Sequence, residues 1–205
     1  MDMMLFHEMH LQKQGFSSIA GVDEAGRGPL AGPVVAAACI LPTGISFPEI
    51  NDSKQLSSKQ RETIYLKLIK HPDVAFGIGQ ASVEEIDRLN ILQATFLAMQ
   101  RAVRVLPKTP DYLLIDGNRA PKFSTPLTTV VQGDSLSVSI AAASILAKVY
   151  RDHMMQLLGK AWPKYRFEKH KGYGTKEHLQ ALQTWGACPI HRTSFAPVAF
   201  QLSQA

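Results

Sequence analysis

The sequence predicts an α/β fold, because segments with the pattern of strands and segments with the pattern of helices alternate along its 205 residues. Short apolar runs bounded by turn residues indicate strands, which we expect at 18–24, 33–41, 73–80, 112–116 and 127–132. Two capping boxes, Ser57 to Gln60 and Ser82 to Glu85, indicate helix starts. The chain shows no internal repeat or low-complexity segment.

The elements follow in a consistent order. The first three strands fit a meander, and the later two follow helices. A stripe with spacings of three and four predicts a helix whose apolar face is core: Leu89, Leu92, Phe96, Met99, Val103 and Leu106. After Asp134 comes an alanine-rich helix whose small side chains allow close packing on the sheet, and Gly159 and Pro163 indicate its end. A further helix is expected near 175–185.

Length and composition suit a soluble protein with one main domain and a small helical extension. We place the main domain at 1–158 and the extension, expected to pack on that domain, at 159–205. There is no run of about 18 apolar residues and no signal-peptide pattern, and the two cysteines form no disulfide framework. We therefore expect a cytoplasmic protein, with no membrane association.

Acidic residues end three apolar runs. Asp23 and Glu24 are followed at once by a glycine-arginine-glycine turn, Asp116 precedes Gly117, and Asp134 precedes a helix. Each has an ordinary structural explanation, as a turn residue, a partner of Arg27 or an acid favoured by a helix dipole. Together they predict a cation site, because buried carboxylates are costly without compensation.

Carboxylate oxygens suit Mg²⁺ or Mn²⁺. A pair of such ions can activate a water and stabilise the leaving oxygen when a phosphodiester is hydrolysed. Four acids suffice for that arrangement.

The formal net charge of +5 favours a polyanionic partner. Residues 164–176 interleave lysine and arginine with Tyr165, Phe167 and Tyr173, which offers phosphate contacts and rings able to stack on bases or sugars. An ordinary solvated loop is the alternative for this basic segment.

A set of short motifs in order, spanning about residues 19 to 198, resembles ribonuclease HII. The motifs are Asp23 to Gly28, Asn51 to Lys54, Ile115 to Gly117, Gly133-Asp134 with Ser139 to Lys148, Lys171 to Thr175, and His191 to Phe195. Each piece is weak alone, and their joint occurrence in order is much more specific. In place of the lysines frequent in the family at two positions, this chain has Gln132 and Leu136, which lowers the local positive charge.

The resemblance implies a ribonuclease H-like mixed five-stranded sheet flanked by helices. It implies an endonuclease that hydrolyses, with two divalent ions, the phosphodiester 5′ to a ribonucleotide in RNA/DNA hybrids or in duplex DNA, leaving 5′-phosphate and 3′-hydroxyl ends. The segment 1–158 would be the catalytic domain, with Asp23, Glu24, Asp116 and Asp134 as its catalytic metal ligands, and the extension at 159–205 would bind substrate. The implied substrate contacts are the 2′-hydroxyl at Gly26, Arg27 and Gly28, a backbone phosphate at Ser53 and Lys54, and the ribonucleotide-deoxyribonucleotide junction at Tyr173.

Other functions fit parts of the sequence. The charge and the basic segment alone would suit a non-catalytic nucleic-acid-binding module, and the acids would suit another ribonuclease H-like nuclease such as a junction resolvase. Gly26 to Ala31 matches a loose dinucleotide pattern, but the prolines around it indicate a turn into a strand. His170, His178 and His191 match no common zinc spacing, so we expect surface or hydrogen-bonding histidines. A monomer is expected, and the sequence leaves open the choice of Mg²⁺ or Mn²⁺ and of single ribonucleotides or long hybrids.

Overall fold

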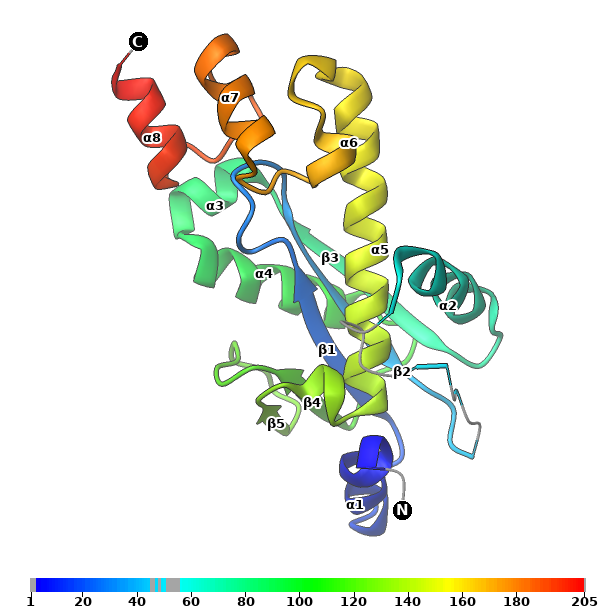
Figure 1. Cartoon of the computed structure of the whole chain (residues 1–205). Helices are drawn as coiled ribbons and strands as arrows, with labels where there is room; N and C mark the ends of the chain where they lie inside the picture. The colour runs from blue at the N-terminus through cyan, green and yellow to red at the C-terminus, as the bar shows by residue number, and fades with distance from the viewer. Residues whose placement is uncertain (1–2, 45–46, 48, 51–55, 205) are drawn as a thin grey trace.

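A computed structural model describes residues 3–44, 47, 49–50 and 56–204 (Figure 1). The strands are β1 (Ile19–Ala25), β2 (Val34–Ile40), β3 (Ala75–Ala81), β4 (Tyr112–Asp116) and β5 (Leu127–Val130). The α-helices are α1 (Phe6–Lys13), α2 (Ser58–Lys70), α3 (Val83–Leu89), α4 (Ile91–Arg104), α5 (Val138–Ala161), α6 (Phe167–His170), α7 (Lys176–Trp185) and α8 (Ala196–Ser203). Short 3₁₀ turns are η1 (Met3–Leu5), η2 (Gly133–Ser135) and η3 (Pro163–Tyr165).

The five strands form one mixed sheet in the order β3-β2-β1-β4-β5. β1, β2 and β3 pair antiparallel as the predicted meander, whereas β4 pairs parallel with both β1 and β5. The predicted α/β class and mixed sheet are confirmed, with strand ends that differ by one or two residues. The last strand stops at Val130, because Gln132 adopts a left-handed conformation with φ of 57° and turns the chain into η2.

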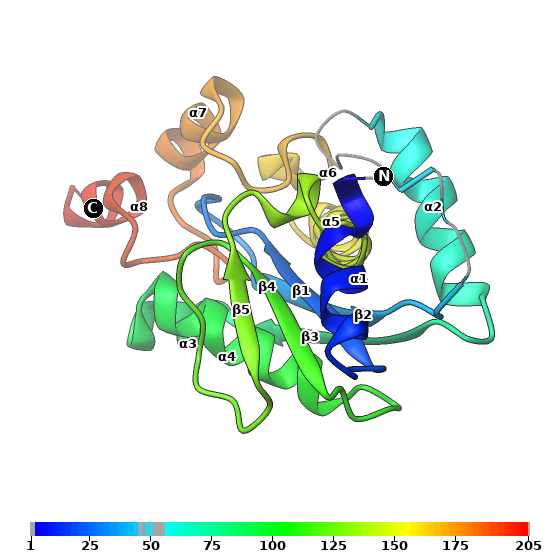
Figure 2. The same ribbon diagram turned by 90° about the horizontal axis from the view of Figure 1, so that it is seen from below.

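Alternating side chains of β2 supply both hydrophobic cores. Val35, Ala37 and Cys39 pack with α5 and α2 on one face, and Ala36 and Ala38 pack with α4 on the other. Figure 2 shows α5, α1 and α2 on one side of the sheet and α3 and α4 on the opposite side. Because both faces are covered, β2 is apolar throughout instead of alternating with polar residues.

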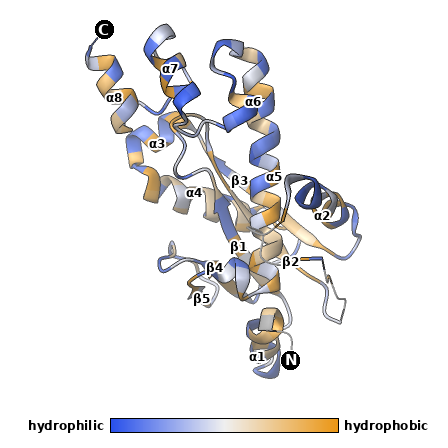
Figure 3. Cartoon of the chain, in the orientation of Figure 1, coloured by the Kyte–Doolittle hydropathy of each residue, from blue (hydrophilic) through white to orange (hydrophobic). Residues whose placement is uncertain are grey.

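α5 approaches the sheet very closely. A Cβ added to Gly21 of β1 would lie 2.0 Å from the carbonyl carbon of Ser139 on α5, so no larger residue fits there. Ala141, Ala142 and Ala143 are fully buried in the same contact, as the alanine-rich pattern predicts. Hydrophobic residues concentrate in the first half of α5, where it crosses β1 and β2 (Figure 3).

The predicted apolar stripe of the third and fourth helices describes the core only in part. Met99 is buried, but Leu89 and Leu92 remain partly exposed, and the deepest face of α4 consists of Ala94, Ala98 and Ala102. The reason is that Gly77 and Gly79 of β3 let the backbone of α4 come close: an added Cβ would lie within 2.3 Å of a helix carbonyl oxygen. Both predicted capping boxes are confirmed, at Ser57 and Ser82.

A buried carboxylate attaches α1 to the start of α5. Glu8 Oε1 accepts hydrogen bonds from the hydroxyls of Ser137 (2.5 Å) and Ser139 (2.7 Å) and from the Ser139 backbone N–H (3.1 Å). Its negative charge lies at the N-terminus of a 24-residue helix, where the helix dipole is favourable. Within the described chain, Glu8 Oε2 is buried without a hydrogen-bond partner.

The C-terminal elements gather at the end of the molecule opposite α1 (Figure 1). The helix expected near 175–185 is α7, and the predicted end of the alanine-rich helix is confirmed at Ala161. The expected boundary between 158 and 159 falls within the last turn of α5, and the division into two units stays a prediction. None of the helices in the described ranges combines the length and apolar character needed to cross a lipid bilayer.

Three histidines form a buried ladder under this end of the molecule. His170 and His178 are stacked with ring centroids 4.5 Å apart, and His178 Nε2 lies 3.0 Å from His191 Nε2. The expectation of hydrogen-bonding histidines is confirmed, whereas a surface location is wrong, because all three are buried. No group of three or more histidine, cysteine or acidic side chains in the described ranges, this ladder included, is arranged to hold a metal ion.

Hydrogen bonds fix the tautomers of the ladder. The backbone N–H of Cys188 donates to His191 Nδ1 (2.9 Å), so the proton of neutral His191 is on Nε2 and is donated to His178. His178 Nδ1–H in turn donates to the carbonyl of Tyr173 (2.9 Å). Both rings must be neutral for this chain of bonds, and burial lowers the pKa of His178 and lowers that of His191 to about 4.

We predict that Glu8→Ala lowers the free energy of unfolding by about 2–3 kcal/mol, because it leaves two buried hydroxyls and a helix N-terminus without their acceptor. The melting temperature should fall by roughly 5–10 °C. The control is Gln12→Ala, which removes an exposed polar side chain from the same helix. Equal melting temperatures for the two variants would contradict the anchoring role of Glu8.

We predict that stability falls as pH drops from about 6.5 towards 4, since the unfolded chain binds protons on His178 and His191 that the folded chain excludes. A histidine with a depressed folded pKa contributes stability above its unfolded pKa and loses it on acidification. The contribution of His191 is on the order of 3 kcal/mol. Urea unfolding of His191→Gln between pH 4 and 7 should show a flatter pH dependence, while exposed His10→Gln should match the parent slope.

Candidate active site

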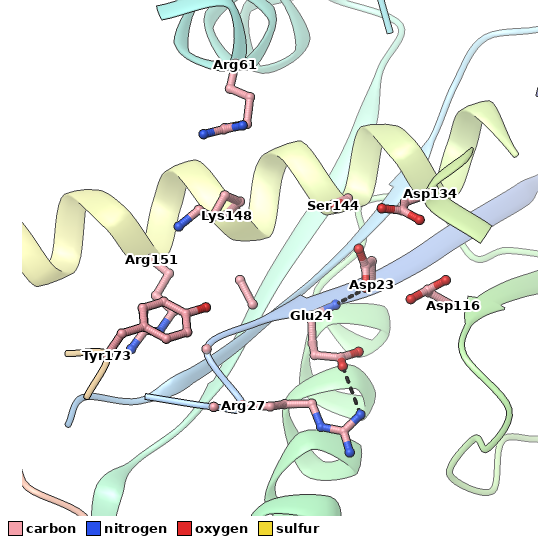
Figure 4. A pocket seen from close by; sticks show the side chains of 13 residues that line it. Asp23, Glu24, Arg27, Arg61, Asp116, Asp134, Ser144, Lys148, Arg151 and Tyr173 are labelled. Carbon is pink, nitrogen blue, oxygen red and sulfur yellow. Dashed lines mark hydrogen bonds and ion pairs between the residues drawn. The ribbon is translucent and has the colours of Figure 1, made fainter. Parts of the chain in front are cut away.

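A cavity of about 400 Å³ opens at the carboxyl end of β1 (Figure 4). It contains all four acids singled out from the sequence, together with the glycine-arginine-glycine turn and the aromatic residue of the basic segment. Its lining residues are Asp23, Glu24, Ala25, Gly26, Arg27, Gly28, Arg61, Asp116, Asp134, Ser144, Lys148, Arg151 and Tyr173.

Parallel strand pairing brings the acids together. Val22 of β1 lies opposite Ile115 of β4, so Asp23 and Asp116, each one residue further on, emerge at the same edge of the sheet. Asp116 lies opposite Val130 of β5, and the chain reaches Asp134 four residues later, in η2. Segments more than ninety residues apart therefore meet at one point.

Local hydrogen bonds hold these carboxylates. Asp23 Oδ1 accepts from the backbone N–H of Glu24 (2.7 Å), and Asp23 also accepts a hydrogen bond from the side chain of Ser144 on α5. Asp116 Oδ1 accepts from the backbone N–H of Gly133 (2.7 Å), which connects the β4 acid to the turn that carries Asp134. Figure 4 shows Asp23, Asp116 and Asp134 near one another on one side of the cavity.

The electrostatic environment of Asp23 and Glu24 is unfavourable to their charges. Burial raises the pKa of Asp23 well above its usual range, and the charges of Glu24 and Asp116 raise it further. Burial also raises the pKa of Glu24, while its ion pair with Arg27 (3.2 Å) opposes this shift. Negative charge is thus concentrated at a poorly solvated place, which is the condition that a bound cation relieves.

Positive side chains lie on the other side of the cavity. Lys148 of α5 is one turn beyond Ser144 on the same helix face, and Arg61 reaches the cavity from α2 (Figure 4). Sequence reasoning assigned neither a role, although Lys148 closes a motif of the resemblance. Its four-residue spacing from Ser144 is a signal that periodicity could have supplied; nothing in the sequence places Arg61 here. Lys148 also forms an ion pair with Asp152, one turn further along α5 (2.8 Å).

The predicted substrate contacts lie beside the acids. Gly26 has φ of 94°, a conformation that favours glycine, and a Cβ on Gly28 would be 3.7 Å from the ring of Tyr173. Tyr173 is 44% exposed, so its ring is accessible to a ligand. Ser53 and Lys54 lie outside the described residues.

One expectation about the basic segment is wrong. Tyr165 and Phe167 are buried, with stacked rings 5.3 Å apart, and pack against Met155 and Ala31. They therefore belong to the core under the extension and are not available to stack on bases. A local pattern of basic and aromatic residues does not distinguish these rings from Tyr173, because their burial depends on contacts with α5 and with the loop after β1.

The donor set fits a hard divalent cation, because it consists of carboxylate oxygens, and burial raises the pKa of two of these groups, Asp23 and Glu24. Among the described residues, the four acids do not surround one point as a ligand group.

Comparison with known proteins identifies the family of this chain. The family model described as ribonuclease HII matches residues 20–198. Ribonuclease HII from Chlamydia muridarum is 59% identical over 186 residues, which cover 91% of this chain and 85% of that protein.

Solved structures share the fold. The crystal structure of ribonuclease H2 from Pyrococcus horikoshii OT3 superposes with a TM-score of 0.74 at 25% identity, covering 91% of this chain and 98% of that one. A crystal structure of Bst-RNase HIII in complex with Mn²⁺ has a TM-score of 0.68 at 20% identity, covering 94% and 72% of the two chains. The match of almost the whole chain to one family model, with a relative of such high identity, means that this chain belongs to the ribonuclease HII family of metal-dependent endoribonucleases.

Proposed function

We propose that this chain cleaves the phosphodiester 5′ to a ribonucleotide, in RNA/DNA hybrids and in duplex DNA with embedded ribonucleotides. The observation that carries the proposal is the meeting of Asp23, Glu24, Asp116 and Asp134 in one cavity with the turn Gly26–Gly28 and with Tyr173. A non-catalytic binding module would not need four carboxylates at such an electrostatic cost.

In this proposal, Asp23, Glu24, Asp116 and Asp134 hold two Mg²⁺ or Mn²⁺ ions. When bound, such a pair activates a water and stabilises the leaving oxygen, giving 5′-phosphate and 3′-hydroxyl ends. Asp23 is kept in place by the Glu24 N–H and by Ser144, and Asp116 by the Gly133 N–H. These bonds orient the carboxylates before substrate arrives, as second-layer contacts do in metal sites.

The remaining cavity residues suit the nucleic acid. Backbone groups of Gly26, Arg27 and Gly28 would contact the 2′-hydroxyl, which is the group that distinguishes RNA from DNA. Tyr173 would stack at the junction between the ribonucleotide and the next deoxyribonucleotide. Lys148 and Arg61 are placed to contact phosphates, and Ser53 and Lys54 stay proposed phosphate contacts on the basis of the family resemblance.

We further propose that the protein acts as a monomer in the cytoplasm, without membrane association. The absence of a disulfide framework from the sequence supports a reducing compartment. Oxygen ligands support either Mg²⁺ or Mn²⁺. The extension at 159–205 is proposed to cover the substrate, supported by the position of Tyr173 at the cavity.

We predict that the purified protein nicks a DNA duplex carrying one internal ribonucleotide, only in the strand with the ribose, 5′ to it, and only with a divalent cation. Asp23→Asn should lower the cleavage rate by more than about a hundredfold, since loss of even an outer-layer contact at a metal site costs 10–100-fold. Strand-specific end labels resolve the scissile position. Comparison with a four-way DNA junction separates this activity from that of a resolvase.

The same variant supplies a control for folding. Asp23→Asn removes a carboxylate whose charged form is disfavoured by burial. Without metal at neutral pH, the melting temperature of the variant should therefore be no lower than that of the parent, and at most about 2–4 °C higher. A folded variant with full activity would exclude Asp23 from metal binding. Cleavage of the parent in chelator would exclude the metal mechanism itself.

We predict that Tyr173→Ala lowers kcat/KM on the single-ribonucleotide duplex by about 10–100-fold, the loss expected from one stacking contact of about 1–3 kcal/mol. Its melting temperature should change little, because the ring is exposed. Trp185→Ala is a matched control, since it removes another exposed aromatic side chain from the extension. Unchanged kinetics in Tyr173→Ala would reject the stacking role.

A further inference from the structure

Two arginines are buried next to the cavity without a carboxylate partner. Arg151 is 1% exposed and Arg192 is 0% exposed, and neither takes part in an ion pair among the described residues. Arg192 donates through Nη2 to Gly26 O (2.5 Å), through Nη1 to Arg27 O (2.8 Å) and through Nε to Gly32 O (2.9 Å). A buried cation held only by backbone carbonyls needs a reason, because its desolvation is expensive.

The cost of the charge is visible at Arg192 itself. Burial and the neighbouring charge of Arg151 lower the pKa of Arg192 to about 9, although Asp87 raises it. Asp87 accepts its own hydrogen bonds from Thr193 and Ser194 instead of from the guanidinium. Arg192 therefore forms no ion pair with Asp87. Its hydrogen bonds instead orient three backbone carbonyl groups.

Those directions determine where the neighbouring N–H groups point. In a trans peptide the carbonyl oxygen and the N–H of the next residue lie in one plane and point in opposite directions, and the described chain contains no cis peptide bond. The carbonyl of Gly26 shares its peptide with the Arg27 N–H, and the carbonyl of Arg27 shares its peptide with the Gly28 N–H. Because Arg192 holds both carbonyl oxygens, the N–H groups of Arg27 and Gly28 point away from the Arg192 guanidinium.

The cavity is bordered by the turn and not by Arg192. Gly26, Arg27 and Gly28 line it, whereas Arg192 does not. Neither the Arg27 N–H nor the Gly28 N–H donates to another group among the described residues. Two backbone donors without an acceptor among the described residues therefore belong to residues that line the cavity, beside the acids.

Arg151 fixes the same turn from a second direction. Its guanidinium donates to the carbonyls of Pro33 (3.0 Å), Lys171 (3.0 Å) and Ala31 (3.1 Å). A Cβ on Gly26 would lie 2.0 Å from Arg151 Nε, so the turn rests directly on this side chain. The Gly26–Gly28 backbone consequently has little freedom to rotate its peptides.

We propose that Arg192 is a positioning residue that determines specificity for ribose, because it aims the Arg27 and Gly28 N–H groups at the 2′-hydroxyl oxygen of the substrate. The inference rests on the proposed function, in which this turn contacts the ribose. Lysine cannot replace arginine in this role, since one ammonium group lacks the planar fork that reaches three carbonyls at once. If the two N–H groups instead bind a phosphate oxygen, Arg192 affects ribose and deoxyribose duplexes equally.

The test compares binding of two duplexes that differ by one oxygen. Affinities for a duplex with a single ribonucleotide and for the same duplex made only of DNA are measured by fluorescence anisotropy in the Asp23→Asn background, where cleavage is blocked. Arg192→Lys should lower the ratio of the two affinities about fivefold to tenfold, the range expected when one or two hydrogen bonds are lost. The control is Arg101→Lys on α4. Arg101 also donates to a backbone carbonyl, that of Gln80 on β3, and its replacement should leave the affinity ratio unchanged.

The ratio separates the possible outcomes, because a lower folded fraction reduces both affinities by the same factor. An unchanged ratio in folded Arg192→Lys, with equal weakening on both duplexes, would overturn the inference in favour of phosphate binding or a purely structural role. A background protein without ribose preference would refute the proposed recognition by the turn before any change at Arg192 is considered.

A second variant covers the case that Arg192→Lys does not fold. The Arg192 guanidinium lies over the Phe195 ring, 5.0 Å from its centroid, so Phe195→Leu loosens the guanidinium while keeping its donors. The affinity ratio should then fall about twofold to threefold in the same direction. A ratio equal to that of the background would overturn the inference.

Discussion

The parallel pairing of β1 with β4, and of β4 with β5, is the constraint on which the site depends. It brings Asp23, Asp116 and the turn carrying Asp134 to one edge of the sheet, although these segments are far apart in the sequence. The arrangement is electrostatically unfavourable in itself, since burial and mutual repulsion raise the pKa of Asp23. It persists because the residues of β1 and β4 that lead to the acids are buried, and the close contact of Gly21 with α5 leaves β1 little freedom.

The part of the site formed by the Gly26–Gly28 turn and Tyr173 is held by hydrogen bonds to backbone carbonyls instead of by ion pairs. The loop after β1 is connected to the extension through Leu30 N–H to Gly172 O (2.8 Å) and Gly32 N–H to Ile190 O (2.8 Å). Buried arginines and the histidine ladder add side-chain donors to carbonyls of the same loops. A loop fixed in this way can present its amides and the Tyr173 ring at a constant distance from the acids, as a cavity that must recognise one sugar requires.

The two sides of the cavity carry opposite charge, and this division follows the architecture. Three of the acids come from the ends of β1 and β4 and the fourth from η2, while Lys148 and Arg61 come from α5 and α2. This arrangement suits a nucleic-acid strand, because the lysine and arginine side chains attract its phosphates while the scissile phosphate must approach a cluster of carboxylates. It agrees with membership of a family of metal-dependent endoribonucleases, and it shows why cations are needed beside the acids.

The sequence by itself determined the strands, both capping boxes and the acids at strand ends, because these follow from local periodicity and from chemistry confined to a few neighbouring residues. Tertiary structure alone decided which rings of the basic segment are exposed: Tyr165 and Phe167 are buried against α5, and Tyr173 faces the cavity. It also decided that Glu8 accepts from Ser137 and Ser139 and that Arg192 holds the carbonyls of Gly26 and Arg27, pairs separated by about 130 to 166 positions. No periodicity relates such distant partners, since a hydrogen bond to a remote carbonyl depends on how whole elements pack and leaves no pattern along the chain.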